Sequence, residues 1–445
     1  MSKQRTSLTI RPSVSFPIRW KCHLNNTIYD VLSQRPNWEE CCDGDENDAS
    51  NCSFVWFDVH WIRTEFDSIP SSQAIFFNHF RNHYELTRKD LLIKNLKRVV
   101  KSLERSHPEE ASRYLFFPPT YTLPAEYALF LESFRKHQGA WIMKPNGKAQ
   151  GKGIFLITKP SQVLDWRRSL AKDQQDKNLY IVQKYIENPL LLGGRKFDLR
   201  LYLLVTSFNP LVAYTYREGF ARLSASRFSM AASDISNNFV HLTNVAIQKQ
   251  DVKVSATAVD NQYLGLKWSL RSLLLYLCSL DNQKALRCFM NIQDLMVRSV
   301  MSVSRTMISD PRCIELYGFD ILIDSDLKPW LIEINASPSL SASDDDDYKL
   351  KYRLLEDMLN VLDLEGQFPA NSERVGGFDR VLFGEEVSSV FYLGSCNDDR
   401  VDQLNSLKKK RVEMDSSAKS LDSTSSKSDT EPFKRNRSNS RLMKI

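Results

Sequence analysis

YGFDILID at residues 317–324 is followed, past a short polar turn, by PWLIEIN at residues 329–335. Both runs are apolar and short, which predicts two strands joined as a hairpin. A turn near residues 326–327 places Asp320 opposite Glu333, with Cβ atoms roughly 5 Å apart. The pairing therefore brings two carboxylates together on an otherwise apolar hairpin.

The second strand of this hairpin also carries an amide. Side chains alternate between the two faces of a strand, so Glu333 and Asn335 share one face, on which Leu331 also lies. Ile332 and Ile334 take the other face. The predicted hairpin thus presents carboxylate and amide oxygens on one side.

Clustered carboxylates repel one another and are costly to desolvate unless a cation lies between them. Oxygen ligands, few in number, suit a Mg²⁺ ion that also binds nucleotide phosphates. We therefore predict that Asp320, Glu333 and Asn335 hold Mg²⁺. The alternative is that Asp320 and Glu333 are ordinary edge-strand charges paired with Lys or Arg.

A second segment has the composition of a phosphate-binding hairpin. Trp141–Pro145 (WIMKP) predicts a short buried strand, and Lys144 is the only charge in it. An ammonium group in such a strand needs a partner, for which nucleotide phosphate is a candidate. The glycines of the next residues, 146–153 (NGKAQGKG), allow backbone N–H groups to close on an anion. The loop is not a Walker A motif, and alone it is more typical of a plain turn.

A third segment combines a strand with a charged repeat. Residues 180–189 predict a strand that ends at a proline and forms a wall for adenine. Further on, Lys196, Asp198 and Arg200 alternate with apolar residues, so period two puts the three charges on one face. Asp198 is a candidate for ribose or a second Mg²⁺, and Lys196 and Arg200 for phosphate or an acidic substrate. An exposed strand face explains the alternation equally well.

Together, a lysine-bearing strand, a glycine-rich flap, a wall strand and an Asp…Glu-x-Asn hairpin resemble the ATP-grasp ligases. Further motifs are GGRKFDLR (193–200), HLTN (241–244), WLIEINASPSL (330–340), FRNHYELTRKD (80–90) and RVGGFD (374–379). The first three are similar to motifs of the tubulin tyrosine ligase-like family, and the last two to its polyglutamylase branch. The resemblance covers roughly residues 17–400.

This resemblance implies an α/β (α+β) ATP-grasp fold with N-terminal, central and C-terminal subdomains, and a nucleotide between the central and C-terminal lobes. It implies that Arg222 and Lys267 bind the incoming glutamate and that Lys144, Arg222 and Glu333 are catalytic. Two alternatives stay open: Arg222 caps a strand end, and Lys267 is a solvated residue at a helix start. The residues that the resemblance assigns to ATP are Lys144, Gln150, Gly151, Gln183, Lys184, Tyr185, Ile186, Lys196, Phe197, Asp198, Thr243 and Asn244.

The implied activity is ATP- and Mg²⁺-dependent ligation of L-glutamate to glutamate side chains of tubulin C-terminal tails, through an acyl phosphate. A tubulin glycine or tyrosine ligase is the alternative within the same chemistry, and a non-catalytic microtubule-binding scaffold is the alternative of another class. The resemblance also implies residence in the cytoplasm and cytoskeleton, in a cilium or flagellar axoneme or basal body, with accessory complex subunits as possible partners.

Composition agrees with such an enzyme. The 445 residues carry a net charge of +6 with a pI near 8.7, which favours an acidic partner. There is no aromatic-interleaved basic module or zinc pattern, so nucleic acid is not predicted as a partner. Eight cysteines without CxxC spacing fit a reducing cytoplasm. No apolar run approaches the roughly 20 residues of a membrane-spanning helix.

Composition shifts along the chain predict its organisation. We expect a flexible arm (1–16), an N-terminal subdomain (17–135) and a central nucleotide-flap subdomain (136–215). After them we expect a C-terminal catalytic subdomain (216–370), a C-terminal extension (371–403) and a disordered basic Ser/Lys-rich tail (404–445).

Local patterns add three expectations. Thr87 is a candidate N-cap for a lysine-rich helix through Lys101, whose basic side chains are either solvated or face the microtubule. Residues 268–309 predict helices with a polar break at residues 281–283. The acidic run at residues 344–347 predicts a solvated loop.

Overall fold

The computed structural model describes residues 16–41, 49, 51–147, 151–172, 179–244, 266–369, 372–388 and 393. The chain divides into two compact units, residues 1–397 and 398–445, and all described residues belong to the first. The predicted basic tail lies outside the described residues, and so does the predicted arm apart from Phe16. Both stay predictions.

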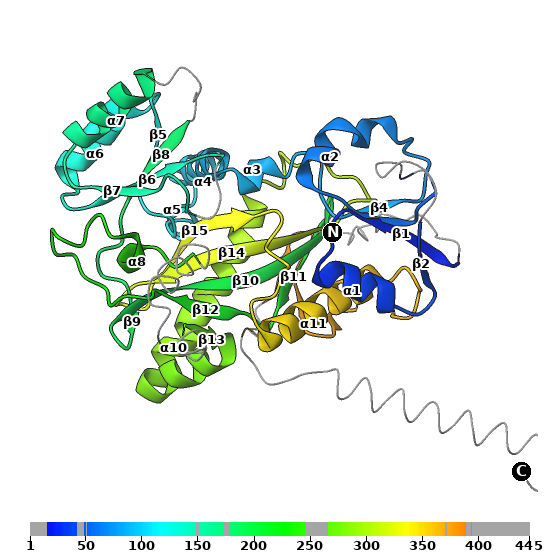
Figure 1. The fold of residues 1–445 in the computed structure, drawn as a ribbon. Coiled ribbons are helices and arrows are strands. Elements are labelled where there is room, and N and C mark those ends of the chain that lie inside the picture. Colours follow the sequence, from blue (N-terminus) through cyan, green and yellow to red (C-terminus); the bar gives the residue numbers. More distant parts are fainter. Residues whose placement is uncertain are drawn as a thin grey trace, which may run out of the picture. The chain divides into compact units, whose positions relative to one another are not determined.

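A ten-stranded sheet forms the centre of the first unit (Figure 1). Its longest strand, β10 (Arg195–Phe208), pairs in antiparallel fashion with β9, β11, β12 and β14. The other strands are β9 (Leu191–Leu192), β11 (Leu211–Tyr216), β12 (Phe220–Leu223), β13 (Lys267–Ser269), β14 (Glu315–Ile323), β15 (Pro329–Asn335), β16 (Arg374–Val375), β17 (Phe378–Phe383) and β18 (Glu386–Val387).

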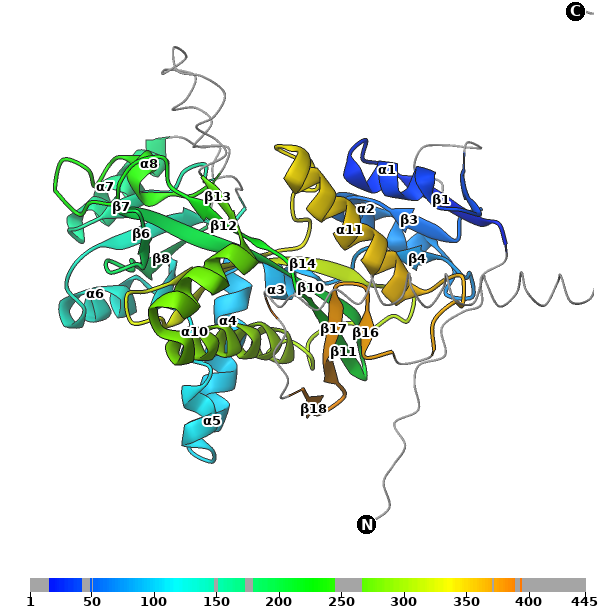
Figure 2. The same ribbon diagram turned by 90° about the horizontal axis from the view of Figure 1, so that it is seen from below.

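The two faces of β10 belong to different cores. Phe197, Leu199 and Leu201 enter one apolar cluster together with helix α10 (Leu270–Met301). Tyr202 and Leu204 enter a second cluster with helix α11 (Asp345–Leu362). Helices α10 and α11 therefore cover opposite faces of the sheet (Figure 2). Lys196, Asp198 and Arg200 lie on the same face of β10 as Tyr202 and Leu204, the face that α11 covers in part.

The charged part of β10 is buried. Lys196, Asp198 and Arg200 are each less than 10% exposed, and their apolar neighbours are fully buried on the other face. The period-two prediction is confirmed, and the alternative of an exposed strand face is wrong. Three charges in such a place must be compensated by partners.

Two four-stranded sheets flank the large one. The first, β2-β1-β3-β4, is parallel and packs with α1 (Thr27–Gln34). The second, β5-β8-β6-β7, is antiparallel and packs with α6 (Tyr127–Lys136) and α7 (Ser161–Lys172). Their strands are β1 (Ile18–Cys22), β2 (Trp38–Glu40), β3 (Phe54–Trp56), β4 (Phe76–Phe77), β5 (Thr120–Leu123), β6 (Trp141–Pro145), β7 (Phe155–Ile157) and β8 (Tyr180–Lys184).

Two strands lie on one side of a predicted subdomain boundary in the sequence but pair with strands from the other side. Strand β5 precedes residue 136 but pairs with β8 of the second small sheet. Strand β10 precedes residue 216 but belongs to the large sheet. The subdomain boundaries themselves stay a prediction.

The remaining described helices are short, except for one lysine-rich helix beside the second small sheet. They are α2 (Val59–Thr64), a 3₁₀ turn (Phe66–Ser68), α3 (Tyr84–Thr87), α4 (Lys89–Leu103), α5 (Pro108–Ser112) and α8 (Asn238–His241).

The helix predictions have mixed outcomes. The break at residues 281–283 is confirmed, because Asp281 inside α10 has non-helical backbone angles. Thr87 is not an N-cap: it ends α3, its hydroxyl donates to the carbonyl of His83, and α4 starts after Arg88. The acidic run is not a loop either, because Asp344 caps α11 and the run forms its first turn.

Candidate active site

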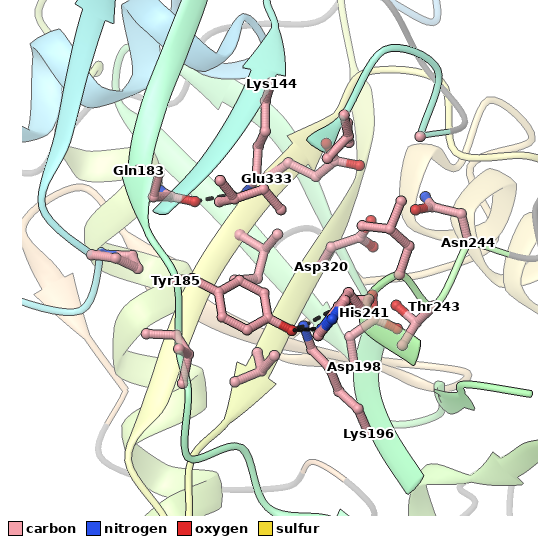
Figure 3. Close-up of a pocket in the computed structure, with 18 of the residues that line it drawn as sticks. Lys144, Gln183, Tyr185, Lys196, Asp198, His241, Thr243, Asn244, Asp320 and Glu333 are labelled. Atoms are coloured by element: carbon pink, nitrogen blue, oxygen red, sulfur yellow. Dashed lines mark hydrogen bonds between the residues drawn. The ribbon is translucent and has the colours of Figure 1, made fainter. Parts of the chain in front are cut away.

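A cavity lies between the second small sheet and the charged part of the large sheet (Figure 3). Lysines, carboxylates and apolar side chains converge on it from both sides. The described residues that line it are Lys89, Pro118, Ile142, Lys144, Gly151, Ile154, Gln183, Lys184, Tyr185, Ile186, Lys196, Asp198, His241, Leu242, Thr243, Asn244, Asp320, Leu322, Ile332 and Glu333.

The hairpin of β14 and β15 forms one wall. Asp320 faces Glu333 across the two strands, so the predicted pairing is confirmed. A β-bulge follows directly, because Ile321 pairs with Leu331 and leaves Ile332 without a partner in the register.

The bulge corrects the predicted faces of β15. Leu331 and Ile334 both enter the apolar core, whereas Ile332 and Glu333 both line the cavity. The prediction that Leu331 shares the face of Glu333 is therefore wrong, because strict alternation fails at the extra residue. The bulge allows two consecutive side chains, one apolar and one acidic, to face the cavity.

Four buried charges form a network beneath this wall. Asp320 accepts from Arg200, Nε to Oδ1 at 2.6 Å and Nη2 to Oδ2 at 3.2 Å. Arg222 donates to both oxygens of Asp198 at 2.8 and 2.6 Å, and its Nη2 lies 3.0 Å from Asp320 Oδ2. Burial opposes ionisation of Asp320, but the two guanidinium groups outweigh it and hold the pKa of this carboxyl well below its usual range.

Lys144 is buried in β6, as predicted, and its partner here is an amide. Its Nζ donates to Gln183 Oε1 at 2.7 Å, and Gln183 Nε2 donates in turn to the hydroxyl of Thr120 at 2.9 Å. Burial lowers the pKa of Lys144 to about 8, against an opposing effect of Glu333. A neutral amide compensates an ammonium only in part, so this lysine is prepared for an anion.

Lys196 is held by two oxygens on the other side of the cavity. Its Nζ donates to the hydroxyl of Tyr185 and to the carbonyl of His241, each at 2.9 Å. The Tyr185 hydroxyl also lies 3.0 Å from His241 Nδ1 (Figure 3). Burial lowers the pKa of Lys196 to about 7, and burial with the nearby Lys196 lowers the pKa of His241. Both lysines are thus poorly neutralised cations that face one cavity.

Lys89 lines the cavity although the sequence interpretation placed it on a helix face with other basic residues. Its Nζ forms an ion pair with Glu333 Oε2 at 3.0 Å. Lys89 starts α4, and no local pattern separates it from the other lysines of that helix. Only the packing of α4 beside the hairpin identifies it.

Arg222 and Lys267 lie side by side on neighbouring strands. Arg222 of β12 pairs in register with Asp198 on one side and with Lys267 of β13 on the other. Arg222 is inside a strand, so the alternative of a strand-end cap is wrong. Lys267 precedes Ser269, which caps α10, and its Nζ forms an ion pair with the buried Asp347 at 2.6 Å, so it is not a solvated helix-start residue.

The structure therefore brings most of the predicted site residues to one cavity. Five are not among its lining residues. Phe197 faces the core on the opposite side of β10, and Gln150 lies outside the described residues. Arg222 pairs in register with the lining residue Asp198, Lys267 pairs with Arg222, and Asn335 lies two residues after the lining residue Glu333 on β15. Besides Lys89, the missed residues are mainly apolar; His241 and Leu242 belong to the HLTN motif, which could have identified them, and the others carry no distinctive local pattern.

Comparison with known proteins identifies the family to which this set of cavity residues belongs. The model of the Tubulin-tyrosine ligase family matches residues 68–372. A rat protein described as "Probable tubulin polyglutamylase TTLL9" is 46% identical over 396 residues, which cover 81% of this chain and 83% of the relative. The chain belongs to the tubulin-tyrosine ligase family.

Other family members agree. A Caenorhabditis elegans "Probable tubulin polyglutamylase ttll-9" is 46% identical and is aligned over 82% of this chain and 85% of its own length. A Tetrahymena thermophila "Probable alpha-tubulin polyglutamylase Ttll1" is 42% identical, over 78% and 86%. The resemblance to the polyglutamylase branch is thus confirmed, and membership of the family makes the chain an ATP-dependent ligase.

The donor set of the hairpin fits the Mg²⁺ that we predict for such an enzyme. Asp320 and Glu333 supply carboxylate oxygens into the cavity, and Asn335 lies two residues along the same strand, where its amide nitrogen donates to the carbonyl of Gly318. Each carboxylate is paired with a cation, Arg200 and Arg222 for one and Lys89 for the other, so the pairing with Lys or Arg that the alternative interpretation expected is present, and Mg²⁺ stays a prediction. Carboxylate oxygens are hard ligands of the kind that Mg²⁺ prefers, and the ion would compete with these cations for them. Within the described residues, no cluster of three His, Cys, Asp or Glu side chains offers an alternative metal site.

The described residues contain no helix long and apolar enough to cross a lipid bilayer.

Proposed function

We propose that this protein is a tubulin polyglutamylase, which uses ATP to ligate L-glutamate to glutamate side chains of tubulin C-terminal tails. The observation that carries the proposal is the arrangement of one cavity. Buried Lys144 faces the Asp320–Glu333 pair across it, buried Lys196 lies on the same wall as the pair, and Arg222 and Lys267 follow on the next strands. The family and the names of the relatives make tubulin the substrate.

ATP binds in the cavity between the small and large sheets. The apolar side chains of Ile142, Ile154 and Leu242 supply walls for adenine, and the segment at residues 183–186 supplies backbone groups. Lys144 and Lys196 bind phosphate oxygens, for which their poorly compensated ammonium groups are suited. Asp198, Thr243, Asn244 and Gly151 complete the contacts to ribose and phosphates, and Gln150 and Phe197 stay predicted contacts without a place in the described cavity.

Asp320, Glu333 and Asn335 would hold Mg²⁺, which supplies positive charge to the phosphoryl oxygens when it is bound. Lys89 contacts Glu333 through Oε2, so the ion would be held through Oε1 or would take the place of Lys89 at Oε2. Arg200 keeps Asp320 ionised and fixed in orientation. The residues of the chain therefore prepare the site before the substrates arrive.

The donor glutamate binds to Arg222 and Lys267. Two cations on adjacent strands, with Cβ atoms roughly 5 Å apart, match an amino acid that carries two carboxylates. Arg222 holds Asp198 through Nε and Nη2, so Nη1 is the nitrogen that we assign to the substrate carboxylate. Glycine and tyrosine lack the second carboxylate, which favours glutamate over the alternative donors.

The reaction needs two displacements. A carboxylate oxygen of the acceptor glutamate bonds to the γ-phosphorus of ATP, and the bond to the ADP oxygen breaks, which gives an acyl phosphate. The amine of the donor glutamate then bonds to the acyl carbon, inorganic phosphate leaves, and the amine loses a proton to solvent. Lys144 stabilises the transferring phosphoryl charge and Arg222 orients the donor. No protein nucleophile is required.

The acceptor is an acidic peptide, for which the net charge of +6 provides long-range attraction. We expect the enzyme in the cytoplasm at microtubules, in a cilium or at a basal body, together with accessory subunits. A non-catalytic scaffold explains the site less well, because buried charges without a ligand-binding role only reduce stability.

The test is a donor panel. Purified protein is incubated with microtubules, MgATP and radiolabelled glutamate, glycine or tyrosine. Incorporation of glutamate alone, dependent on ATP, supports the proposal. Incorporation of glycine or tyrosine instead identifies the alternative ligase, and incorporation of none of the three with intact microtubule binding identifies the scaffold.

A further inference from the structure

We infer that Asp347, in the first turn of α11, is a positioning residue that presents Lys267 to the donor glutamate. This inference rests on the proposed function, because it assigns a role next to the donor site. Lys267 Nζ lies 2.6 Å from Asp347 Oδ1 and 3.9 Å from the centre of the Phe220 ring. The lysine thus sits between a carboxylate and an aromatic face, beside Arg222.

Asp347 is itself held firmly. Its Oδ2 accepts from Lys351 Nζ at 2.9 Å and from the backbone nitrogen and hydroxyl of Ser343 at 3.0 and 3.1 Å. Its backbone nitrogen donates to Oδ1 of Asp344, the N-cap of the helix. The side chain of Asp347 is 4% exposed. Oδ2 is therefore saturated, and Oδ1 is left to face Lys267.

The contact to Lys267 uses the other carboxylate oxygen of Asp347. Nζ and Oδ1 are 2.6 Å apart, and hydrogen bonding to Lys267 helps to lower the pKa of Asp347. An ammonium group has three N–H donors, so those that do not face Asp347 stay available for a substrate carboxylate.

The charges of the cluster explain why two lysines surround one aspartate. Burial opposes ionisation of Asp347, but Lys267 and Lys351 lower its pKa, so it is a carboxylate. Asp347 and Lys351 together carry no net charge, and Lys267 keeps its own positive charge for the donor. A free lysine loses rotamer entropy when a ligand orders it, and a lysine that is already ordered has lost that entropy before the ligand binds.

The start of α11 is braced from the N-terminal part of the chain. The hydroxyl of Thr27 in α1 donates to the carbonyl of Leu340 at 2.7 Å, and the hydroxyl of Tyr348 donates to Asp30 at 3.0 Å. Lys351 Nζ also donates to the carbonyl of Ser341 at 2.6 Å. Asp347 is thus attached to a rigid support, as a positioning residue requires.

The test is a double-mutant cycle on KM for glutamate, measured with saturating ATP and microtubules. We expect Asp347→Asn to raise this KM about tenfold, with KM for ATP within about twofold of wild type. In a Lys267→Met background, Asp347→Asn should then have no further effect, because its partner is gone. Asp346→Asn is the matched control, since Asp346 is exposed on the same turn, and should leave both constants unchanged.

A second variant separates positioning from folding. Asp347→Asn leaves Lys351 buried without its anion, and Asp347→Asn with Lys351→Met removes that defect. We expect the double variant to recover thermal stability but to keep the raised KM for glutamate. Recovery of wild-type KM together with stability, an unchanged or lower KM in Asp347→Asn, or an equal effect in the Lys267→Met background would overturn the inference. Wild-type protein that incorporates no glutamate contradicts the proposed function instead, and this is visible before any variant is compared.

Discussion

The two walls of the cavity compensate their buried charges in different ways. On the second small sheet (β5-β8-β6-β7), Lys144 has a single hydrogen-bond partner, the neutral amide of Gln183. On the large sheet, Asp198, Arg200, Arg222 and Asp320 compensate one another across three strands. The first wall offers its charge to a ligand, and the second has, besides the ligand-facing Lys196, a framework of four charges that balance one another. Function and stability should therefore separate between the two walls.

The largest expected effect is on the framework. Asp320→Ala leaves Arg200 and Arg222 buried and mutually repelling, so we expect a loss of about 3–5 kcal/mol in the free energy of unfolding, together with all activity. Urea unfolding measures it. Asp326→Ala, in the exposed turn of the same hairpin, should change stability by less than about 0.5 kcal/mol. A stable Asp320→Ala protein would remove the contrast between the walls.

Glu333 tests whether the hairpin combines both roles. Its side chain is 20% exposed and its ion-pair partner, Lys89, lies on α4, outside the framework. We expect Glu333→Gln to lower kcat by about 100-fold or more while the free energy of unfolding changes by less than about 1 kcal/mol. Kinetics and urea unfolding on the same preparation give both numbers. A large loss of stability here would place Glu333 in the framework.

Lys144 tests the small-sheet wall. We expect Lys144→Met to raise KM for ATP at least about tenfold, since a phosphate loses its cation. The free energy of unfolding should stay within about 1 kcal/mol, because loss of the hydrogen bond to Gln183 is offset by removal of a buried charge. Lys152→Met, in the exposed flap, is the control, and its KM should stay at the wild-type value. Equal effects of the two substitutions would argue against a specific role for Lys144.

The smallest effect is on protonation. Burial lowers the pKa of Lys144 to about 8 and of Lys196 to about 7, so both are partly neutral at pH 8 in the free enzyme. Phosphate raises both pKa values, so ATP binding should take up protons and weaken as pH rises from 7 to 9. Calorimetry in buffers of different ionisation enthalpy measures the uptake. Between these pKa values and 10.5 the unfolded chain binds more protons than the folded protein, so the free energy of unfolding should rise with pH in that window. Release of protons on ATP binding would refute the assignment of these two lysines to phosphate.

The sequence predicts the parts of this site that depend on local periodicity. Alternation placed Lys196, Asp198 and Arg200 on one face, and the length of the turn placed Asp320 opposite Glu333. The family resemblance supplied Arg222 and Lys267, which period and spacing could not identify. Short-range patterns are reliable where one strand or one tight hairpin sets the geometry.

Other features depend on packing between distant segments. The bulge after Asp320 exchanges the faces of Leu331 and Ile332, and no residue of the strand marks it. Lys89 is one of several lysines of its helix and is distinguished only by its contact with Glu333. Asp347 looks like part of a solvated acidic run until the start of α11 buries it. Each of these follows from contacts that a linear pattern does not contain.

The role of the hairpin carboxylates is tested most directly by ATP-dependent incorporation of labelled glutamate into microtubules. Wild-type protein and Glu333→Gln are compared at matched concentration after folding of both has been confirmed. We expect ready incorporation by the wild type and a loss of about 100-fold or more in the variant. Undiminished incorporation by Glu333→Gln would contradict the claim that the hairpin carboxylates act on the phosphates of ATP.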